Sequence, residues 1–256
     1  MPTDRLNDAA SAQQQYGNRF ETMKESTGIS ASRLALATAV LPALLFPVTY
    51  LIAASGGHVD WCVPPLEGCT DITHTGLKYP ESHVFRIVMP VVSLLFVLVW
   101  LSAYDWVRRV HGEVGPRERR FRNLGVIAAV ALFVGEMVLQ GKETLWALHS
   151  IGATLFFILT YAALVIHHRV MTTLASARPG RVSERSLKAK RVIVRLLTVM
   201  LIAAIAVKIA RWREGGRILQ WLSTYGILGY VFTLSLDWRG YRLHLARLVA
   251  ESGEQR

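Results

Sequence analysis

Residues 33–54 read RLALATAVLPALLFPVTYLIAA, a nearly unbroken apolar stretch long enough to cross a lipid bilayer as one helix. Five further apolar stretches follow along the chain, at about 86–107, 123–140, 145–166, 192–210 and 218–238. Because roughly 20 apolar residues span the hydrocarbon core, each stretch predicts one transmembrane helix. The expected fold is therefore all-α, a polytopic membrane bundle of six transmembrane helices.

The composition also indicates a membrane protein. Of the 256 residues, 52% are hydrophobic and 18% are charged, whereas soluble domains carry about 25% charged residues. The net charge of +11 does not indicate a nucleic-acid partner, because no nucleic-acid-binding motif is present and the basic clusters lack interleaved aromatic residues. The expected partners are membrane lipids, and a membrane-protein partner or a homo-oligomer stays open.

Lys and Arg are divided unequally between alternate connections of this bundle. The two terminal segments together with residues 108–122 and 169–195 hold 22 of the 29 basic residues. Since basic residues accumulate in cytoplasmic loops, both termini are expected in the cytosol. Residues 1–31 are predicted to be a flexible cytosolic tail and residues 241–256 a cytosolic C-terminal tail, around a membrane domain of residues 32–240.

Two acidic residues, Asp105 and Asp237, lie at the cytosolic ends of apolar stretches. We expect them to pair with the arginines next to them in sequence: Arg108, Arg109 and Arg239.

The polar segment 55–86 between the first two apolar stretches is then expected outside the cytosol or in an organelle lumen. It contains both cysteines of the chain, Cys62 and Cys69, in a compartment where disulfides persist. A disulfide between them is expected, with two unpaired thiols as the alternative. No metal site and no cofactor are predicted. The less favoured alternative is a metal held by three histidines of this segment: His58, His74 and His83.

Ionisable residues inside apolar stretches are costly unless they find a partner or a wet cavity. Alternating helix directions put four polar residues at one depth below the 55–86 segment: Glu136, His149, Lys208 and Gln220. Gln140 continues the face of Glu136 by one helical turn. Taken one at a time, these residues also have structural explanations: an ion pair between Glu136 and Lys208, and an interhelical hydrogen bond at His149. Together the four residues predict a polar cleft.

In such a cleft an imidazole beside a carboxylate can act as general base on water or a lipid hydroxyl. We therefore expect His149 or His74 as the catalytic base and Glu136 or Asp71 as the residue that orients it. The sequence has no HExxH, no Gly-x-Ser-x-Gly and no glycine-rich phosphate loop. Whether the protein is an enzyme stays open; a lipid acyltransferase or an ester hydrolase is the expected class.

Three short motifs carry a family resemblance: DITHTG at residues 71–76, HSIGA at 149–153 and LQW at 219–221. They resemble the six-span family of the damage-regulated autophagy modulators (DRAM), the FRAG and SFK proteins, and the Golgi proteins that remodel GPI-anchor lipids. The family usually has an acidic residue where Gln220 stands, so a carboxylate role is not expected there.

The resemblance covers about residues 33–240. It implies a protein of the plasma membrane or the endomembranes that handles or remodels lipid, either phospholipid or GPI-type. The candidate lipid-binding residues are Gln140, Gln220, Thr73, Thr75, Lys208 and Gly152. Two other functions stay open: a non-enzymatic scaffold or regulator of lipid distribution or trafficking, and a proton-coupled small-solute carrier.

Overall fold

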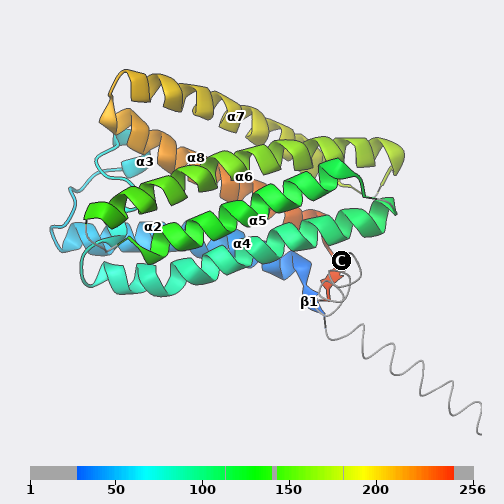
Figure 1. The fold of residues 1–256 in the computed structure, drawn as a ribbon, viewed down its shortest axis with the longest axis horizontal. Coiled ribbons are helices and arrows are strands. Elements are labelled where there is room, and N and C mark those ends of the chain that lie inside the picture. Colours follow the sequence, from blue (N-terminus) through cyan, green and yellow to red (C-terminus); the bar gives the residue numbers. More distant parts are fainter. Residues whose placement is uncertain (1–27, 113, 140–142, 181, 245–256) are drawn as a thin grey trace, which may run out of the picture.

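The computed structural model describes residues 28–112, 114–139, 143–180 and 182–244, without the side chains of residues 143 and 144. Six long helices lie side by side along the long axis of the molecule (Figure 1). They are α2 (Ala31–Ser55), α4 (Glu81–His111), α5 (Pro116–Met137), α6 (Glu143–Ala177), α7 (Glu184–Ile209) and α8 (Arg213–Asp237). The all-α membrane architecture expected from the apolar stretches is therefore present.

Four of these helices are long and apolar enough to cross a membrane: α2, α4, residues Leu145–Ala177 of α6, and α7. Helices α5 and α8 do not meet the same standard of length and composition. The first turns of α5 contain a run of charged residues at 117–120, and α8 mixes its apolar residues with glycine, serine and threonine. Length and composition thus support a polytopic membrane protein without establishing six crossings.

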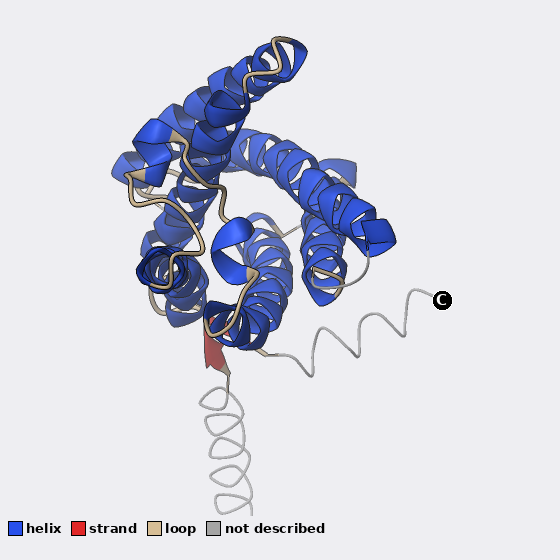
Figure 2. Cartoon of the chain, turned by 90° about the vertical axis from the view of Figure 1, so that its left-hand side faces the viewer, coloured by secondary structure: helices blue, strands red, loops and turns tan. Residues whose placement is uncertain are grey.

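The long helices pack as a ring, which Figure 2 shows from the end of the bundle that carries α3. Along the chain, α2 packs against α4, α4 against α5, and α5 against α6, while α8 packs against both α2 and α7. Helices α6 and α8 contact each other only marginally, so α7 bridges them. Only 11% of the apolar window of α7 is buried, the smallest share among the four candidate spans. The ring is therefore least tightly closed on the side of α7.

At one end of the bundle, strand β1 (Ile29–Ser30) pairs antiparallel with β2 (Arg242–Leu243). The two ends of the described chain therefore meet at the same end of the ring. Residues 29–30 and 242–243, which the sequence assigns to the two tails, therefore form a small sheet next to the bundle. Of the predicted tails, residues 1–27 and 245–256 lie outside the described residues.

The other end carries the loop with α3 (Pro64–Glu67) and the short 3-10 helix η1 (His74–Gly76). A disulfide joins Cys62 to Cys69 within this loop. Side chains of α8 hold the loop in place: Trp221 Nε1 donates to the Thr70 carbonyl at 3.0 Å, and Arg217 donates to the Cys69 carbonyl at 2.8 Å. The loop is thus a fixed cap over one end of the ring.

Candidate functional site

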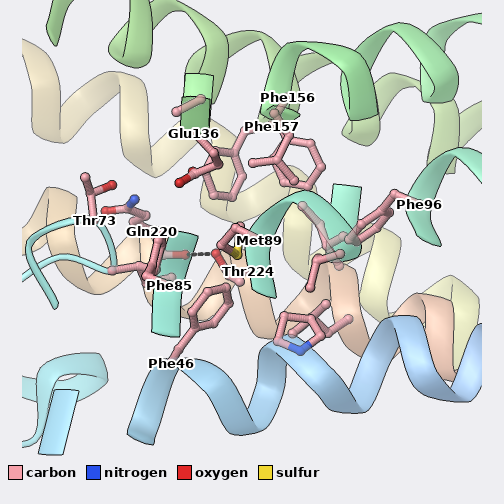
Figure 3. A pocket seen from close by; sticks show the side chains of 17 residues that line it. Phe46, Thr73, Phe85, Met89, Phe96, Glu136, Phe156, Phe157, Gln220 and Thr224 are labelled. Carbon is pink, nitrogen blue, oxygen red and sulfur yellow. Dashed lines mark hydrogen bonds between the residues drawn. The ribbon is translucent and has the colours of Figure 1, made fainter. Parts of the chain in front are cut away.

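A narrow pocket of about 50 Å³ lies inside the ring, at the end that the loop covers (Figure 3). Five of the long helices and the loop contribute to its wall, which is mostly apolar. Figure 3 shows Thr73, Glu136 and Gln220 near one end of the pocket and Phe96 near the other. The structure therefore brings three of the residues singled out in the sequence to the same pocket.

Glu136 is the acidic residue of this pocket. Its Oε2 atom is buried and has no hydrogen-bond partner within the described part of the chain. Leaving a buried polar atom unpaired costs about 1–3 kcal/mol, so this oxygen is a ready partner for a polar group of a ligand. The alternative explanation of Glu136, an ion pair with Lys208, is wrong, because Lys208 is exposed and lines a different cavity.

His149 is buried and makes two hydrogen bonds that link three parts of the chain. Its Nδ1 atom lies 3.0 Å from the carbonyl oxygen of Gly135 on α5, and its Nε2 atom lies 3.2 Å from Thr73 Oγ1 in the loop. A carbonyl can only accept, so Nδ1 carries the proton and Nε2 of the neutral ring accepts from the Thr73 hydroxyl. The Gly135 backbone carbonyl therefore orients His149, in place of the Glu136 or Asp71 side chain, whereas Asp71 does bind His74, the other imidazole considered as a base.

Asp71 and His74 form a pair of their own, with 2.8 Å between His74 Nδ1 and Asp71 Oδ2. The Trp146 ring packs against both histidines: its centroid lies 5.8 Å from that of His74 and 5.4 Å from that of His149. Neither Asp71 nor His74 lines the inner pocket. Their assignment as catalytic residues in the same site as Glu136 is therefore not supported by their position.

The pair shifts the pKa values of both of its members. The hydrogen bond from Asp71 raises the pKa of His74 above its ordinary value of 6.5, although partial burial and Arg217 oppose this. Burial alone would raise the pKa of Asp71, but hydrogen bonds and charge from His74 outweigh burial and lower it. The pair is therefore ionic over a wider pH range than two isolated side chains would be.

A larger groove of about 590 Å³ lies outside the inner pocket, between α6, α7 and α8. Lys208 lines it, and the rest of its wall is mainly apolar. The groove and the inner pocket have four lining residues in common: Ala153, Phe157, Gln220 and Ile227. Next to Lys208, a shallower pocket is lined by two further basic side chains, Arg211 and Arg213. The two cavities are therefore neighbours across a wall that includes Gln220.

Two of the predicted lipid-binding residues, Thr75 and Gly152, hold elements of the fold together. The buried Thr75 hydroxyl donates to the Ile72 carbonyl at 2.7 Å and lies 3.1 Å from Thr49 Oγ1, which ties the loop to α2. Gly152 lies where α6 crosses α5, and a Cβ atom there would come within 2.7 Å of the Ala131 carbonyl oxygen. Neither residue lines the inner pocket or the groove. Gln140 lies outside the described residues.

The three histidines of the alternative metal site do not come together. His58 Nδ1 lies 2.6 Å from Oε1 of the buried Glu81, His74 pairs with Asp71, and the His83 ring packs against Tyr79. Within the described ranges, no three His, Cys, Asp or Glu side chains are grouped so that they could hold a metal ion. The alternative metal site is therefore wrong.

The sequence interpretation missed a buried polar cluster between α6, α7 and α8. Lys190 Nζ lies 2.5 Å from Asp237 Oδ2 and 2.6 Å from Ser186 Oγ. Close by, His167 Nδ1 lies 2.8 Å from the Tyr230 hydroxyl. The predicted pairing of Asp237 with Arg239 is wrong, whereas Asp105 does bind Arg108 and Arg109 as expected.

The fold and the site define a helical integral membrane protein with a polar site enclosed by its helices. The chain matches the family model of the Frag1/DRAM/Sfk1/Cwh43P N-terminal domain over residues 30–241, and it belongs to this family. The matched region includes all six long helices, which confirms the resemblance read from the three motifs. Comparisons with curated proteins and with solved structures give no match.

Proposed function

We propose that the protein binds a phospholipid of the outer or lumenal leaflet. The acyl chain occupies the groove between α6, α7 and α8, and the polar part of the lipid reaches Gln220, Glu136 and Thr73. The observation that carries this proposal is the wall shared by the apolar groove and the inner pocket, because Gln220 lines both cavities. A lipid in the groove would therefore lie beside the buried polar groups.

The dimensions and lining of the groove support this occupant. Its volume of about 590 Å³ falls within the range of about 300–1,000 Å³ that is typical of small-molecule sites. The wall is formed largely by Leu, Ile, Ala, Phe and Met side chains, which suit a hydrocarbon chain. Since α7 exposes most of its apolar surface, a lipid would enter sideways from the bilayer.

Basic side chains at the groove favour an anionic headgroup. Lys208 lines the groove, and Arg211 and Arg213 line the pocket next to it. Each basic residue near a membrane surface contributes about 1 kcal/mol of attraction to anionic lipid. Phospholipids and GPI-type lipids share the phosphate that these side chains would bind, so both fit the site.

This function implies six crossings, with both termini in the cytosol and residues 55–86 outside it or in a lumen of the plasma membrane or endomembranes. The pairing of β1 with β2 supports an even number of crossings, and the distribution of Lys and Arg supports the orientation. Helices α5 and α8 would then cross the bilayer within the ring, where their polar residues face other helices.

Lipid binding is tested by filling the groove. Ala204 lines the groove, whereas Ala206 on the same helix is exposed and does not line it. Ala204→Trp should reduce the phospholipid that co-purifies in mild detergent at least tenfold, as measured by lipid mass spectrometry. Ala206→Trp is the matched control and should retain the lipid. Absence of bound phospholipid from the unmodified protein, or equal loss in both variants, would contradict the proposal and favour a scaffold.

A further inference from the structure

Thr73, His149 and Gly135 form a chain of hydrogen bonds that begins at the wall of the inner pocket. The Thr73 hydroxyl lies 3.2 Å from His149 Nε2, and His149 Nδ1 lies 3.0 Å from the Gly135 carbonyl oxygen. Thr73 lines the pocket, and His149 lies behind it, away from the pocket surface. A hydroxyl, an imidazole that accepts its proton, and a group that fixes the imidazole tautomer are the parts of an activated nucleophile.

The local fold holds each of these groups in place. Thr73 immediately precedes η1, and its carbonyl accepts from Gly76 N at 3.0 Å, which closes the turn. The loop around it is fixed to α8 through Trp221. His149 lies on α6 directly opposite α5, so that its ring reaches the Gly135 backbone. The Thr73–His149 geometry is therefore set by rigid neighbours.

A second hydroxyl–base pair in the described chain, Ser186 with Lys190, does not suit chemistry on a substrate. Both side chains are wholly buried and Lys190 is bound to Asp237. Neither residue lines the inner pocket or the groove. By contrast, Thr73 shares its pocket with Gln220 and with the unpaired oxygen of Glu136. The pocket of Thr73 also shares four lining residues with the groove in which the lipid is proposed to lie.

We propose that Thr73 is the catalytic nucleophile of an acyl-transfer reaction on an ester-linked lipid, with His149 as its general base. Thr73 Oγ attacks the ester carbonyl carbon while His149 Nε2 takes the hydroxyl proton. The carbon–oxygen bond to the glycerol then breaks, and the proton passes from Nε2 to the leaving oxygen. This yields an acyl-Thr73 ester and a lysolipid, and a second hydroxyl, of water or of another lysolipid, removes the acyl group in the reverse sequence.

The Gly135 carbonyl acts as a positioning group in this scheme, because it holds the proton on Nδ1 and leaves Nε2 free to accept. The Gln220 amide, at the same end of the pocket in Figure 3, is suited to donate to the ester oxygen as negative charge develops on it. This inference rests on the proposed lipid binding, and it adds the reaction and the residue that carries the acyl group.

The experiment uses the full-length protein in mixed micelles with 1-palmitoyl-2-oleoyl-phosphatidylglycerol, an anionic phospholipid. Lysolipid release and an acylated Thr73 peptide are followed by mass spectrometry. Thr73→Val, which keeps the shape and removes the hydroxyl, should abolish the adduct and lower turnover at least a thousandfold. Thr73→Ser should retain both. His149→Gln should lower turnover about 10²–10⁴-fold, the usual contribution of a general base.

Thr173→Val is the matched control. Thr173 lines neither the inner pocket nor the groove, and its hydroxyl donates to the Arg169 carbonyl of its own helix at 3.2 Å, so the variant should keep its turnover. Bound lipid is measured on every variant. If the unmodified protein binds lipid but forms no acyl adduct, or forms it on another residue, Thr73 is not the nucleophile while lipid binding stands. If no lipid binds, the proposed function itself fails.

Discussion

Lys190 on α7 and Asp237 at the end of α8 form an ion pair with 2.5 Å between Nζ and Oδ2, and neither side chain is exposed to solvent. The ammonium group of Lys190 also lies 5.6 Å from the centre of the Tyr230 ring. The pair therefore joins the helix that closes the ring, α7, to the rest of the bundle. Because it lies away from the pocket, its role is to hold α7 against α8.

Breaking this pair should destabilise the protein strongly. Lys190→Met leaves the Asp237 carboxylate buried without its partner, which typically costs about 3–5 kcal/mol. The expected result is a clear fall in the thermal unfolding temperature in detergent. Lys188→Met, a change of the same kind at an exposed position of the same helix, should have little effect. The double variant Lys190→Met/Asp237→Leu should recover much of the loss, and a double variant as unstable as Lys190→Met would contradict the pair's assigned role.

The Asp71–His74 pair predicts a pH window for the stability of the loop. The pKa of His74 is raised, so its contribution is complete below about pH 6.5 and is lost as the pH rises through the raised value. The pKa of Asp71 is lowered, so its contribution is complete above about pH 3.8 and is lost as the pH falls through the lowered value. The pair should therefore stabilise the loop most between about pH 3.8 and 6.5.

Histidine NMR titration checks this window directly. In the unmodified protein the His74 resonance should titrate above 6.5, and in Asp71→Asn it should move down, because the hydrogen bond to a carboxylate is lost. An unchanged His74 titration in Asp71→Asn would show that the pair does not form in solution.

The orientation of the bundle can be tested with single cysteines, because the chain has only two cysteines and both are in the disulfide. Lys78→Cys in the capping loop should react with a membrane-impermeant maleimide at the outer or lumenal face of sealed membranes. Arg185→Cys, at the start of α7, should react only from the cytosolic face. Labelling of both cysteines from the same face would contradict six crossings with cytosolic termini.

The apolar stretches predict that the long helices exist, but they do not predict the residues at which these helices begin and end. Helix α4 begins at Glu81 and α6 continues to Ala177, beyond the stretches predicted at 86–107 and 145–166. Charged and polar residues continue a helix readily, so the polarity of the sequence marks the expected membrane boundary and not the helix end. Fold class and family were therefore within reach of the sequence, and helix limits were not.

The residues of the inner pocket could likewise be predicted from the sequence only in part. Alternation of helix direction places Glu136 and Gln220 at one depth, and the structure brings them to one pocket. The rotation of each helix about its axis decides which side chains face inward, and no sequence pattern fixed it here. For this reason Lys208 was expected beside Glu136 but lies in the outer groove. The partner of His149 is the Gly135 backbone, which carries no side chain that sequence patterns could single out.

Gly152 provides a test of how closely α5 and α6 must approach for the Thr73–His149 geometry. A Cβ atom at this position would lie 2.7 Å from the Ala131 carbonyl oxygen and 2.9 Å from Gly135 Cα, both backbone atoms that cannot turn aside. Gly152→Ala should therefore push the helices apart and cost about 1–3 kcal/mol, as overpacking does. The same shift would lengthen the hydrogen bond from His149 to Gly135.

Gly229→Ala on α8 is the matched control, because the nearest atom to the new methyl group would be Ile193 Cδ1 at 3.8 Å, an ordinary contact. That variant should be neutral or more stable by up to about 1 kcal/mol, since alanine favours the helix. Thermal unfolding in detergent measures both variants, and the histidine NMR spectrum reports the His149 hydrogen bond. If Gly152→Ala is as stable as Gly229→Ala and leaves the His149 signal unchanged, close contact of α5 and α6 does not position the imidazole.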